Sequence, residues 1–138
     1  MPSNLVFREA ASLSCAGVTA WNALYGAGTG LRPGDWVLTI GTGGVSILAV
    51  QFAKAAGARV ISTTSSPAKA ELLRKLGADV VINYKETENW GEEAKKITGG
   101  GVDFVLEVGG PSSKCLVQKL VFYMRKGANE EIQLLCKV

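Results

Sequence analysis

The sequence predicts an α/β fold: a doubly wound parallel sheet of the Rossmann type, with about five strands and helices on both faces. Two observations predict it. Short apolar segments of strand length alternate with longer segments of helical periodicity. A glycine run within VLTIGTGGVS (37–46) lies between the first of these strands and the next helix. At 138 residues the chain is long enough for one domain with its own core, and we take 1–138 as that domain.

The first half of the chain is expected to form a helix, a strand and a second helix around the glycines. Residues 8–25 form an alanine-rich helix, 26–35 a loop with a turn at Pro33-Gly34, and 36–40 the first strand. Gly57 is expected to end the second helix in a left-handed conformation. The apolar face of that helix consists of Val45, Leu48, Ala49, Phe52 and Ala56.

The second half repeats the alternation of strand and helix. Strands are predicted at 59–64, 80–84, 102–108 and near 131–136, and further helices at 86–101 and 112–126. Pro67 opens the helix after the second strand, where its missing N–H has no consequence. The buried side of that helix is expected to be Leu72, Leu73 and Leu76. Right-handed crossovers then place a crevice between the first and fourth strands, where the winding reverses.

Composition excludes several classes of function. The net charge is +3 without a basic stripe, so a nucleic-acid partner is not expected. The chain has no histidine, which excludes a Ser–His–Asp triad or a histidine-rich metal site within it. Its three cysteines are too far apart for a metal knuckle. Neither a membrane span nor a signal peptide is recognised, so a cytoplasmic location is expected.

The glycine run is suited to an anionic ligand. The helix that follows it offers unpaired N–H groups and the positive end of its dipole. Gly41 permits the tight turn, and Gly43 and Gly44 let a pyrophosphate approach the backbone. The third glycine of the usual G-x-G-x-x-G pattern falls at Ser46, which is small enough for close packing. A tight turn without a ligand is the alternative.

The end of the second strand separates three nucleotide chemistries. Methyltransferases that use S-adenosylmethionine usually have an acidic residue two positions before the first glycine, where this chain has Thr39, and a carboxylate at the second strand end. A carboxylate about 20 residues after the glycines also selects NAD. Here that end reads TTSS (63–66), whose hydroxyls can donate to a 2′-phosphate, and Lys69 adds positive charge. The segment therefore favours NADP(H) over NAD(H), with an S-adenosylmethionine site or a simple helix cap as alternatives.

Four segments in order resemble the medium-chain dehydrogenase/reductase superfamily, above all its quinone-oxidoreductase-like and zinc-type alcohol-dehydrogenase-like branches. They are REAASLSCAGVTAW, GTGGVSILAVQFAKAAGARVI, LLRKLGADVVINY and GGGVDFVLEVGG. The resemblance, which runs from Arg8 to Pro111, implies a dinucleotide site. That site consists of Thr19, Gly41, Thr42, Gly43, Gly44, Val45, Thr64, Ser65, Lys69, Tyr84, Val108 and Gly109. Lys69 and Tyr84 match residues that hold the 2′-phosphate in quinone reductases.

The resemblance also implies the reaction of a longer enzyme. Family members have a mostly β catalytic domain before this point, whereas seven residues precede the first motif here. We therefore expect the NADP(H)-binding domain of an oxidoreductase that moves hydride between nicotinamide and a quinone, enone, aldehyde or alcohol. The fragment is expected to have no catalytic residue of its own and no turnover alone. Cys15 matches a zinc ligand of one branch, but a single thiolate cannot form a zinc site, so a small buried residue is expected there.

A non-catalytic alternative remains. Family members pair through the edge strand of this domain, so a homodimer is expected, and a dimerisation domain with a degenerate nucleotide site would give the same sequence pattern. After Pro111 the sequence departs from the family, with Asn129 and Glu130 in place of a glycine pair.

Overall fold

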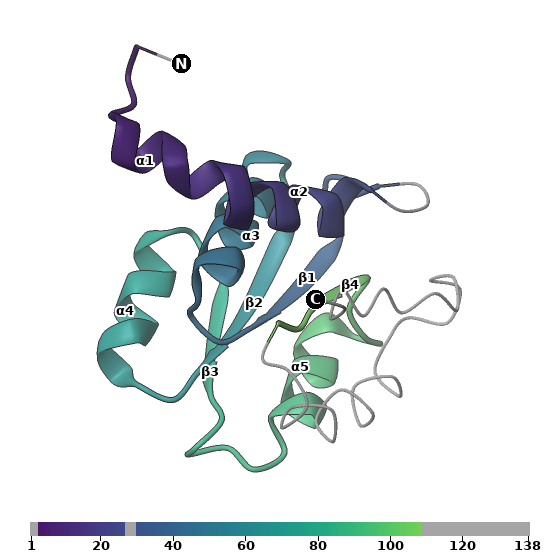
Figure 1. The fold of residues 1–138 in the computed structure, drawn as a ribbon. Helices are drawn as coiled ribbons and strands as arrows, with labels where there is room; N and C mark the ends of the chain where they lie inside the picture. The colour runs from purple at the N-terminus through teal and green to yellow at the C-terminus, as the bar shows by residue number, and fades with distance from the viewer. Residues whose placement is uncertain (1–2, 27–29, 109–138) are drawn as a thin grey trace.

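The computed structural model of the chain describes residues 3–26 and 30–108, which form a parallel sheet covered by helices (Figure 1). Within these residues the sheet has four strands, in the order β3-β2-β1-β4. They are β1 (Trp36–Ile40), β2 (Arg59–Thr64), β3 (Val80–Asn83) and β4 (Phe104–Leu106). The predicted α/β fold class is confirmed, and β1 has β2 on one side and β4 on the other, as the predicted reversal of winding requires. The helix and strand predicted at 112–126 and 131–136 lie outside the described residues.

Helices cover both faces of the sheet. One face carries α3 (Gly44–Ala55) and α4 (Pro67–Lys75), and the other carries α5 (Trp90–Thr98). Before the sheet, α1 (Phe7–Ser12), the π-helical turn η1 (Leu13–Gly17) and α2 (Val18–Tyr25) follow one another directly. Both η1 and α2 pack against α3. The helical segment before the sheet therefore packs on α3, the helix that follows β1 in the sequence.

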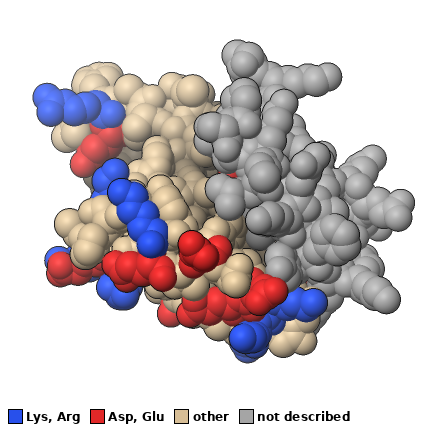
Figure 2. Space-filling view, turned by 90° about the horizontal axis from the view of Figure 1, so that it is seen from below, with Lys and Arg blue, Asp and Glu red and all other residues tan. Residues whose placement is uncertain are grey.

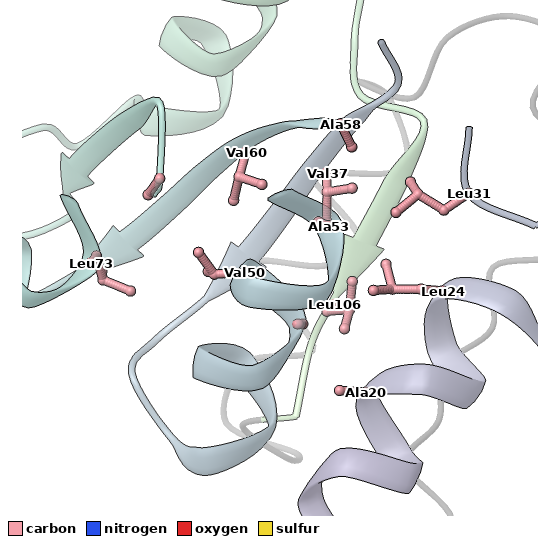
Figure 3. Close-up of a cluster of buried hydrophobic side chains, with 12 residues drawn as sticks. Ala20, Leu24, Leu31, Val37, Val50, Ala53, Ala58, Val60, Leu73 and Leu106 are labelled. Atoms are coloured by element: carbon pink, nitrogen blue, oxygen red, sulfur yellow. The ribbon is translucent and has the colours of Figure 1, made fainter. Parts of the chain in front are cut away.

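Two buried clusters hold these layers together. Successive residues of a strand point to opposite faces, so Val37 and Val60 face α3 whereas Leu38 and Ile61 face α5. Figure 3 shows the first cluster, in which Leu24 of α2 and Leu73 of α4 also take part. Burying one such aliphatic side chain contributes about 1.5–3 kcal/mol.

The first two strands occur at the predicted residues. Gly57 follows α3 with φ of 78°, which confirms the predicted left-handed end. The most buried residues of α3 are Ser46, Ala49, Val50 and Ala53. Four of the five predicted to face the core, Val45, Leu48, Phe52 and Ala56, are only half-buried, although they pack against it. The face toward the sheet is thus rotated slightly from the predicted one.

The predicted core face of α4 is wrong at one residue. Leu72 is 43% exposed, whereas Leu73 is fully buried and Leu76 half-buried. Ala70 and Leu73, three positions apart, form the side of this short helix that meets the sheet. Leu72 fits the same hydrophobic pattern, but its side chain lies on the neighbouring face of the helix, away from the sheet.

The remaining strands are shorter than predicted. β3 ends at Asn83 rather than residue 84, and β4 covers 104–106 rather than 102–108. The predicted helix at 8–25 is a continuous helical segment with a π-turn inside it. In that turn the N–H of Val18 donates to the carbonyl of Leu13, five residues before. Nothing in the sequence predicted this extra residue in the turn.

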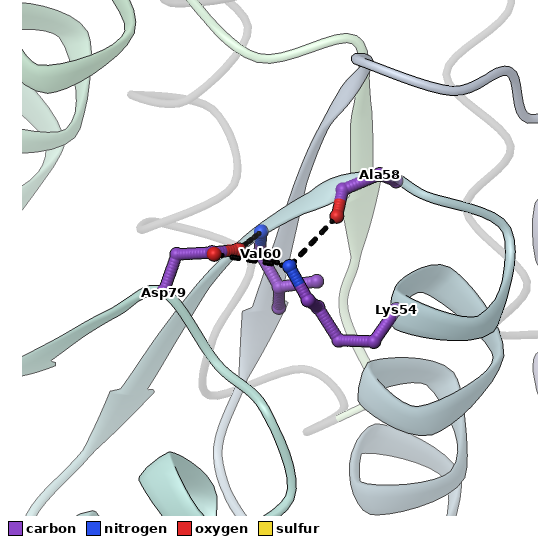
Figure 4. Close-up of polar contacts among 4 residues, drawn as sticks. All are labelled: Lys54, Ala58, Val60 and Asp79. Atoms are coloured by element: carbon purple, nitrogen blue, oxygen red, sulfur yellow. Dashed lines mark hydrogen bonds and ion pairs between the residues drawn. The ribbon is translucent and has the colours of Figure 1, made fainter.

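The amino edge of the sheet is tied by one polar network (Figure 4). Lys54 Nζ donates to the two carboxylate oxygens of Asp79, at 3.0 and 2.9 Å, and to the Ala58 carbonyl at 3.1 Å. Asp79 also accepts from the N–H of Val60 at 2.7 Å. Partial burial raises the pKa of Asp79, but the hydrogen bonds from Lys54 and Val60 and the charge of Lys54 outweigh it, so the pKa lies below its ordinary value of 3.8.

Candidate functional site

The carboxyl ends of all four strands lie at one edge, where the glycine run leaves β1. Gly41 has φ of 80°, a conformation that only glycine adopts without strain. Its N–H donates to the carbonyl of Thr63 in β2 at 3.1 Å. The turn is therefore sharp and is tied to the neighbouring strand.

Gly43 caps α3 and leaves room in front of it. Its φ of −73° and ψ of 169° are open to any residue, and no side chain of the described residues caps the helix at this position. Within the described residues, no atom lies within 4 Å of a β carbon built on Gly43. The N–H groups at the start of a helix and its positive dipole end attract anions. The space that a β carbon would fill thus fits a pyrophosphate group.

Ser46, at the position of the third glycine of the usual pattern, forms a hydrogen bond between α3 and β1. Its side chain is 1% exposed, and its hydroxyl donates to the carbonyl of Ile40 at 3.0 Å. The hydroxyl joins the first turn of α3 to the end of β1, which a glycine would not do. The expected close packing is observed, together with a hydrogen bond that the sequence did not predict.

The first helical segment closes the other side of the glycine run. A β carbon built on Gly44 would lie 3.5 Å from the β carbon of Ala16, in η1. That is ordinary van der Waals contact, so Gly44 faces a neighbouring helix while Gly43 faces open space. π-Turns occur frequently near functional sites, and this one lies against the start of α3.

Thr64 and Tyr84 meet at the carboxyl ends of β2 and β3. The N–H of Tyr84 donates to the Thr64 carbonyl at 3.1 Å. The Thr64 side chain is buried, and its oxygen accepts from the N–H of Ser66 at 3.3 Å, which makes the turn into α4. Ser65, inside this turn, is half-buried, and Tyr84 is 42% exposed. The two strand ends predicted to receive the adenosine part are therefore adjacent.

Lys69 lies in the first turn of α4 and is exposed. Its helix starts directly after the Thr64–Ser66 turn, with Pro67 at the first helical position as predicted. The structure places Lys69 on the same carboxyl edge as Thr64, and it leaves the ammonium group in solvent.

The residues predicted beside the nicotinamide are described in part. Thr19 is half-buried, and its hydroxyl donates to the Cys15 carbonyl at 2.9 Å, as serine and threonine often do within helices. Two further predicted cofactor residues, Thr42 and Val45, belong to the glycine run rather than to the nicotinamide end, and both are half-buried. Val108 follows β4 and is 37% exposed. Gly109 lies outside the described residues.

Cys15 is exposed, so the expectation of a small buried residue is wrong at this position. It lies in the π-turn, in a stretch from residue 11 to residue 15 that is exposed throughout. Among residues 3–26 and 30–108 no group of three or more His, Cys, Asp or Glu side chains is placed to hold a metal ion. In the same part of the chain, no helix has the length and apolar character that crossing a membrane requires.

Asn83, the last residue of β3, was missed by sequence reasoning. Its side-chain amide donates to the Glu86 carboxylate at 2.5 Å, and its side-chain oxygen accepts from the N–H of Lys85 at 3.1 Å. Asparagine commonly forms such a turn with the backbone two residues on, so the NYKE segment carried a signal for it. The bond to Glu86 had no such signal.

The chain matches a protein family over most of its length. Residues 44–129 match the family described as zinc-binding dehydrogenase. A zinc-type alcohol dehydrogenase-like protein of Schizosaccharomyces pombe is 50% identical over 128 residues, which are 91% of this chain and 36% of that protein. The chain thus spans little more than a third of the length of this relative.

Solved structures give the same answer at the level of the fold. An NAD-dependent alcohol dehydrogenase is 36% identical with a TM-score of 0.76, and the match covers 90% of this chain and 35% of that one. A mycobacterial protein complexed with NADPH is 32% identical with a TM-score of 0.78, over 91% of this chain and 38% of that one. The chain therefore belongs to the zinc-binding dehydrogenase family and forms a nucleotide-cofactor-binding domain of the medium-chain dehydrogenase/reductase type.

Proposed function

We propose that this domain binds NADP(H) in preference to NAD(H) along the carboxyl edge of its sheet, within a larger oxidoreductase that acts on a quinone, enone, aldehyde or alcohol. The observation that carries the proposal is the open space in front of Gly43, at the amino end of a twelve-residue helix. A helix start that is neither capped by a described side chain nor blocked by a β carbon suits a bound diphosphate.

The pyrophosphate is assigned to the backbone of Gly43, Gly44 and Val45. The tie from Gly41 to Thr63 and the tie from Ser46 to Ile40 support this assignment, because they fix the loop before any ligand arrives. A loop that is already ordered loses little conformational entropy on binding. Thr42 lies within the same loop, between Gly41 and Gly43, and is assigned to the pyrophosphate through its position there.

The adenosine end is assigned to Thr64, Ser65, Lys69 and Tyr84. Two observations support a 2′-phosphate there: residues 63–66 carry no carboxylate, and the start of the Tyr84 segment is bonded to Thr64. A charge-assisted hydrogen bond from Lys69 would favour the phosphate over a hydroxyl. The similar structures include an NAD-dependent enzyme and an NADPH complex, so the preference is a proposal about this chain's own residues.

The nicotinamide end is assigned to Thr19, Val108 and Gly109. When bound, the cofactor supplies or accepts the hydride at its nicotinamide ring, and the protein's part is to orient that ring. In this chain the half-buried Thr19 lies in α2, which packs against α3, and the exposed Val108 follows β4, which pairs with β1. We assign no proton transfer to this domain. The groups that bind the substrate are expected in the rest of the enzyme.

Calorimetric titration of the chain with NADPH, NADH and S-adenosylmethionine tests the proposal. We expect binding of NADPH, weaker binding of NADH, and no heat from S-adenosylmethionine. Binding of S-adenosylmethionine alone would replace the proposal with a methyltransferase-type site. Binding of no nucleotide, together with a stable dimer in sedimentation, would instead favour the dimerisation alternative.

A homodimer through an edge strand and a cytoplasmic location stay predictions. Sedimentation of the chain at several concentrations tests the first, and a fluorescent fusion in the native cell tests the second. Measurable NADPH-dependent quinone reduction by the purified chain would contradict the expected inactivity of the domain alone.

A further inference from the structure

The end of β3 lies against the proposed 2′-phosphate site. Asn83 pairs directly with Thr64, and paired residues of neighbouring parallel strands point to the same face of a sheet. The next residue, Tyr84, donates its N–H to the Thr64 carbonyl at 3.1 Å. The chain therefore enters the turn before α5 directly beside the hydroxyl groups assigned to the adenosine end.

Asn83 fixes the turn that follows. Its backbone carbonyl accepts from the N–H groups of Glu86 and Thr87, at 3.1 and 3.0 Å. Its side chain accepts from the N–H of Lys85 and donates to the Glu86 carboxylate, at 3.1 and 2.5 Å. Because these four bonds all converge on Asn83, the Glu86 carboxylate is held close to the strand end despite its exposure to solvent.

The segment from 85 to 93 is acidic. It carries four glutamates and one lysine, all exposed: Lys85, Glu86, Glu88, Glu92 and Glu93. In Figure 2 acidic side chains form a band across the face seen from below, with basic side chains among and beside them. Of the four glutamates, Glu86 is the one bonded to a residue that pairs with Thr64.

A held carboxylate at this place acts on a phosphate electrostatically. Asn83 is in register with Thr64 on the neighbouring strand, so a carboxylate bonded to the Asn83 side chain stands at the strand end next to Thr64. Like charges that lie within about one Debye length, about 8 Å at physiological ionic strength, repel measurably in water. NADP(H) differs from NAD(H) by its 2′-phosphate, so the repulsion affects one cofactor and spares the other.

We infer that Glu86, positioned by Asn83, is a specificity-determining residue that limits the preference of this domain for NADP(H). The inference rests on the proposed function and refines it: Lys69 favours the 2′-phosphate, and Glu86 opposes it. The domain would then discriminate between the two cofactors less strongly than Lys69 and the strand-end hydroxyls alone would make it.

The test compares Glu86→Gln with Glu88→Gln by calorimetric titration with NADPH and with NADH. Glutamine keeps an oxygen that accepts from Asn83, so the turn is preserved, and Glu88→Gln removes the same charge two residues further on. We expect Glu86→Gln to bind NADPH roughly two- to fivefold more tightly, with NADH unchanged, and more strongly so at low salt. Glu88→Gln is expected to change NADPH affinity less than twofold.

Other outcomes would overturn the inference. Equal gains in the two variants would show a general charge effect, and equal gains for the two cofactors would show a change in the turn. Glu86→Ala, which also lacks the charge, must reproduce the NADPH gain, and a loss of NADPH affinity in both Glu86 variants would refute the repulsion. If the parent chain binds both cofactors and Glu86→Gln changes neither, this inference alone fails. If the parent chain binds neither, the proposed function fails and takes the inference with it.

Discussion

Ala16 faces Gly44 across two helical segments: a β carbon built on Gly44 would lie 3.5 Å from the β carbon of Ala16. Two of the smallest residues thus let η1 approach the start of α3 closely. The segment before the sheet sets where the first N–H groups of α3 lie. A change of volume at either residue is expected to be felt at the nucleotide loop.

Ala16→Val tests this contact. Overfilling a well-packed contact costs about 1–3 kcal/mol, so we expect a lower unfolding midpoint and weaker NADPH binding. Ala11→Val is the matched control, because Ala11 is exposed in α1 and only helix propensity changes there, by about 0.5 kcal/mol. Thermal unfolding and calorimetry measure the two effects. Equal effects of the two substitutions would show that the Ala16 contact has no special importance.

Gly43→Ala is expected to separate binding from folding. Its backbone is open to alanine and the new β carbon has no neighbour within 4 Å in the described part of the chain, so the unfolding midpoint should change little. The same methyl group occupies the room assigned to the pyrophosphate, so NADPH affinity should fall at least about tenfold, or about 1.4 kcal/mol. Gly41→Ala should instead destabilise the fold by about 1–2 kcal/mol, because φ there is 80°. Unchanged NADPH affinity in Gly43→Ala would remove the pyrophosphate from this loop.

Lys69→Ala tests the 2′-phosphate assignment. Losing a charge-assisted hydrogen bond of about 1.5–3 kcal/mol should weaken NADPH binding by more than tenfold and leave NADH nearly unchanged. Lys75→Ala serves as control, since Lys75 lies at the far end of α4 and pairs with Glu71 at 3.0 Å. Titration of both variants with both cofactors gives the answer. Parallel losses for NADPH and NADH in Lys69→Ala would show that the lysine does not meet the 2′-phosphate.

Two buried threonines are expected to respond in opposite directions. Thr63 is 0% exposed, and its hydroxyl has no hydrogen-bond partner among the described residues. Thr63→Val should therefore stabilise the fold by about 1 kcal/mol, because a desolvated hydroxyl is removed. Thr39 is equally buried, but its hydroxyl shares a 2.8 Å hydrogen bond with that of Ser62. Thr39→Val should cost about 1–3 kcal/mol, because Ser62 is left without its partner. Denaturant unfolding measures both, and a loss of stability in Thr63→Val would contradict the prediction.

Acid should weaken the amino edge of the sheet through Asp79. Its pKa in the folded state lies below the ordinary value of 3.8, so its contribution to stability is present above about that pH and is lost as the pH falls through the folded pKa. Asp79→Asn should lower the unfolding midpoint at pH 6 and reduce the further loss on going to pH 3. The pair is partly exposed, so the effect is modest. An identical acid response in the variant would assign the acid sensitivity to other carboxylates.

The sequence predicted the fold because its strongest signals are local. Apolar runs bounded by glycine or proline place β1 and β2 to the residue, and the left-handed Gly57 follows from the same pattern. What it missed depends on residues that meet only in the folded chain. Leu72 and Leu73 have the same chemistry, and only packing against the sheet decides that one is buried.

The candidate site was predictable in its backbone and less so in its side chains. Strand order alone brings Thr64 next to Tyr84, since parallel strands end at one edge. The π-turn that contains Cys15 could not be predicted, because no residue pattern marks a single extra residue in a helix. The bond between Asn83 and Glu86 depends on two side chains that meet only in the folded turn.

The bond between Lys54 and Asp79 stands at the end of the sheet opposite the glycine run. Substitutions at sites that share no partners usually add in their free energies. Substitutions in the turns of the proposed nucleotide site are therefore expected to leave the contact between Lys54 and Asp79 intact. Residues at one end of the sheet can then change in evolution while the contact that joins α3 to the start of β3 at the other end is kept.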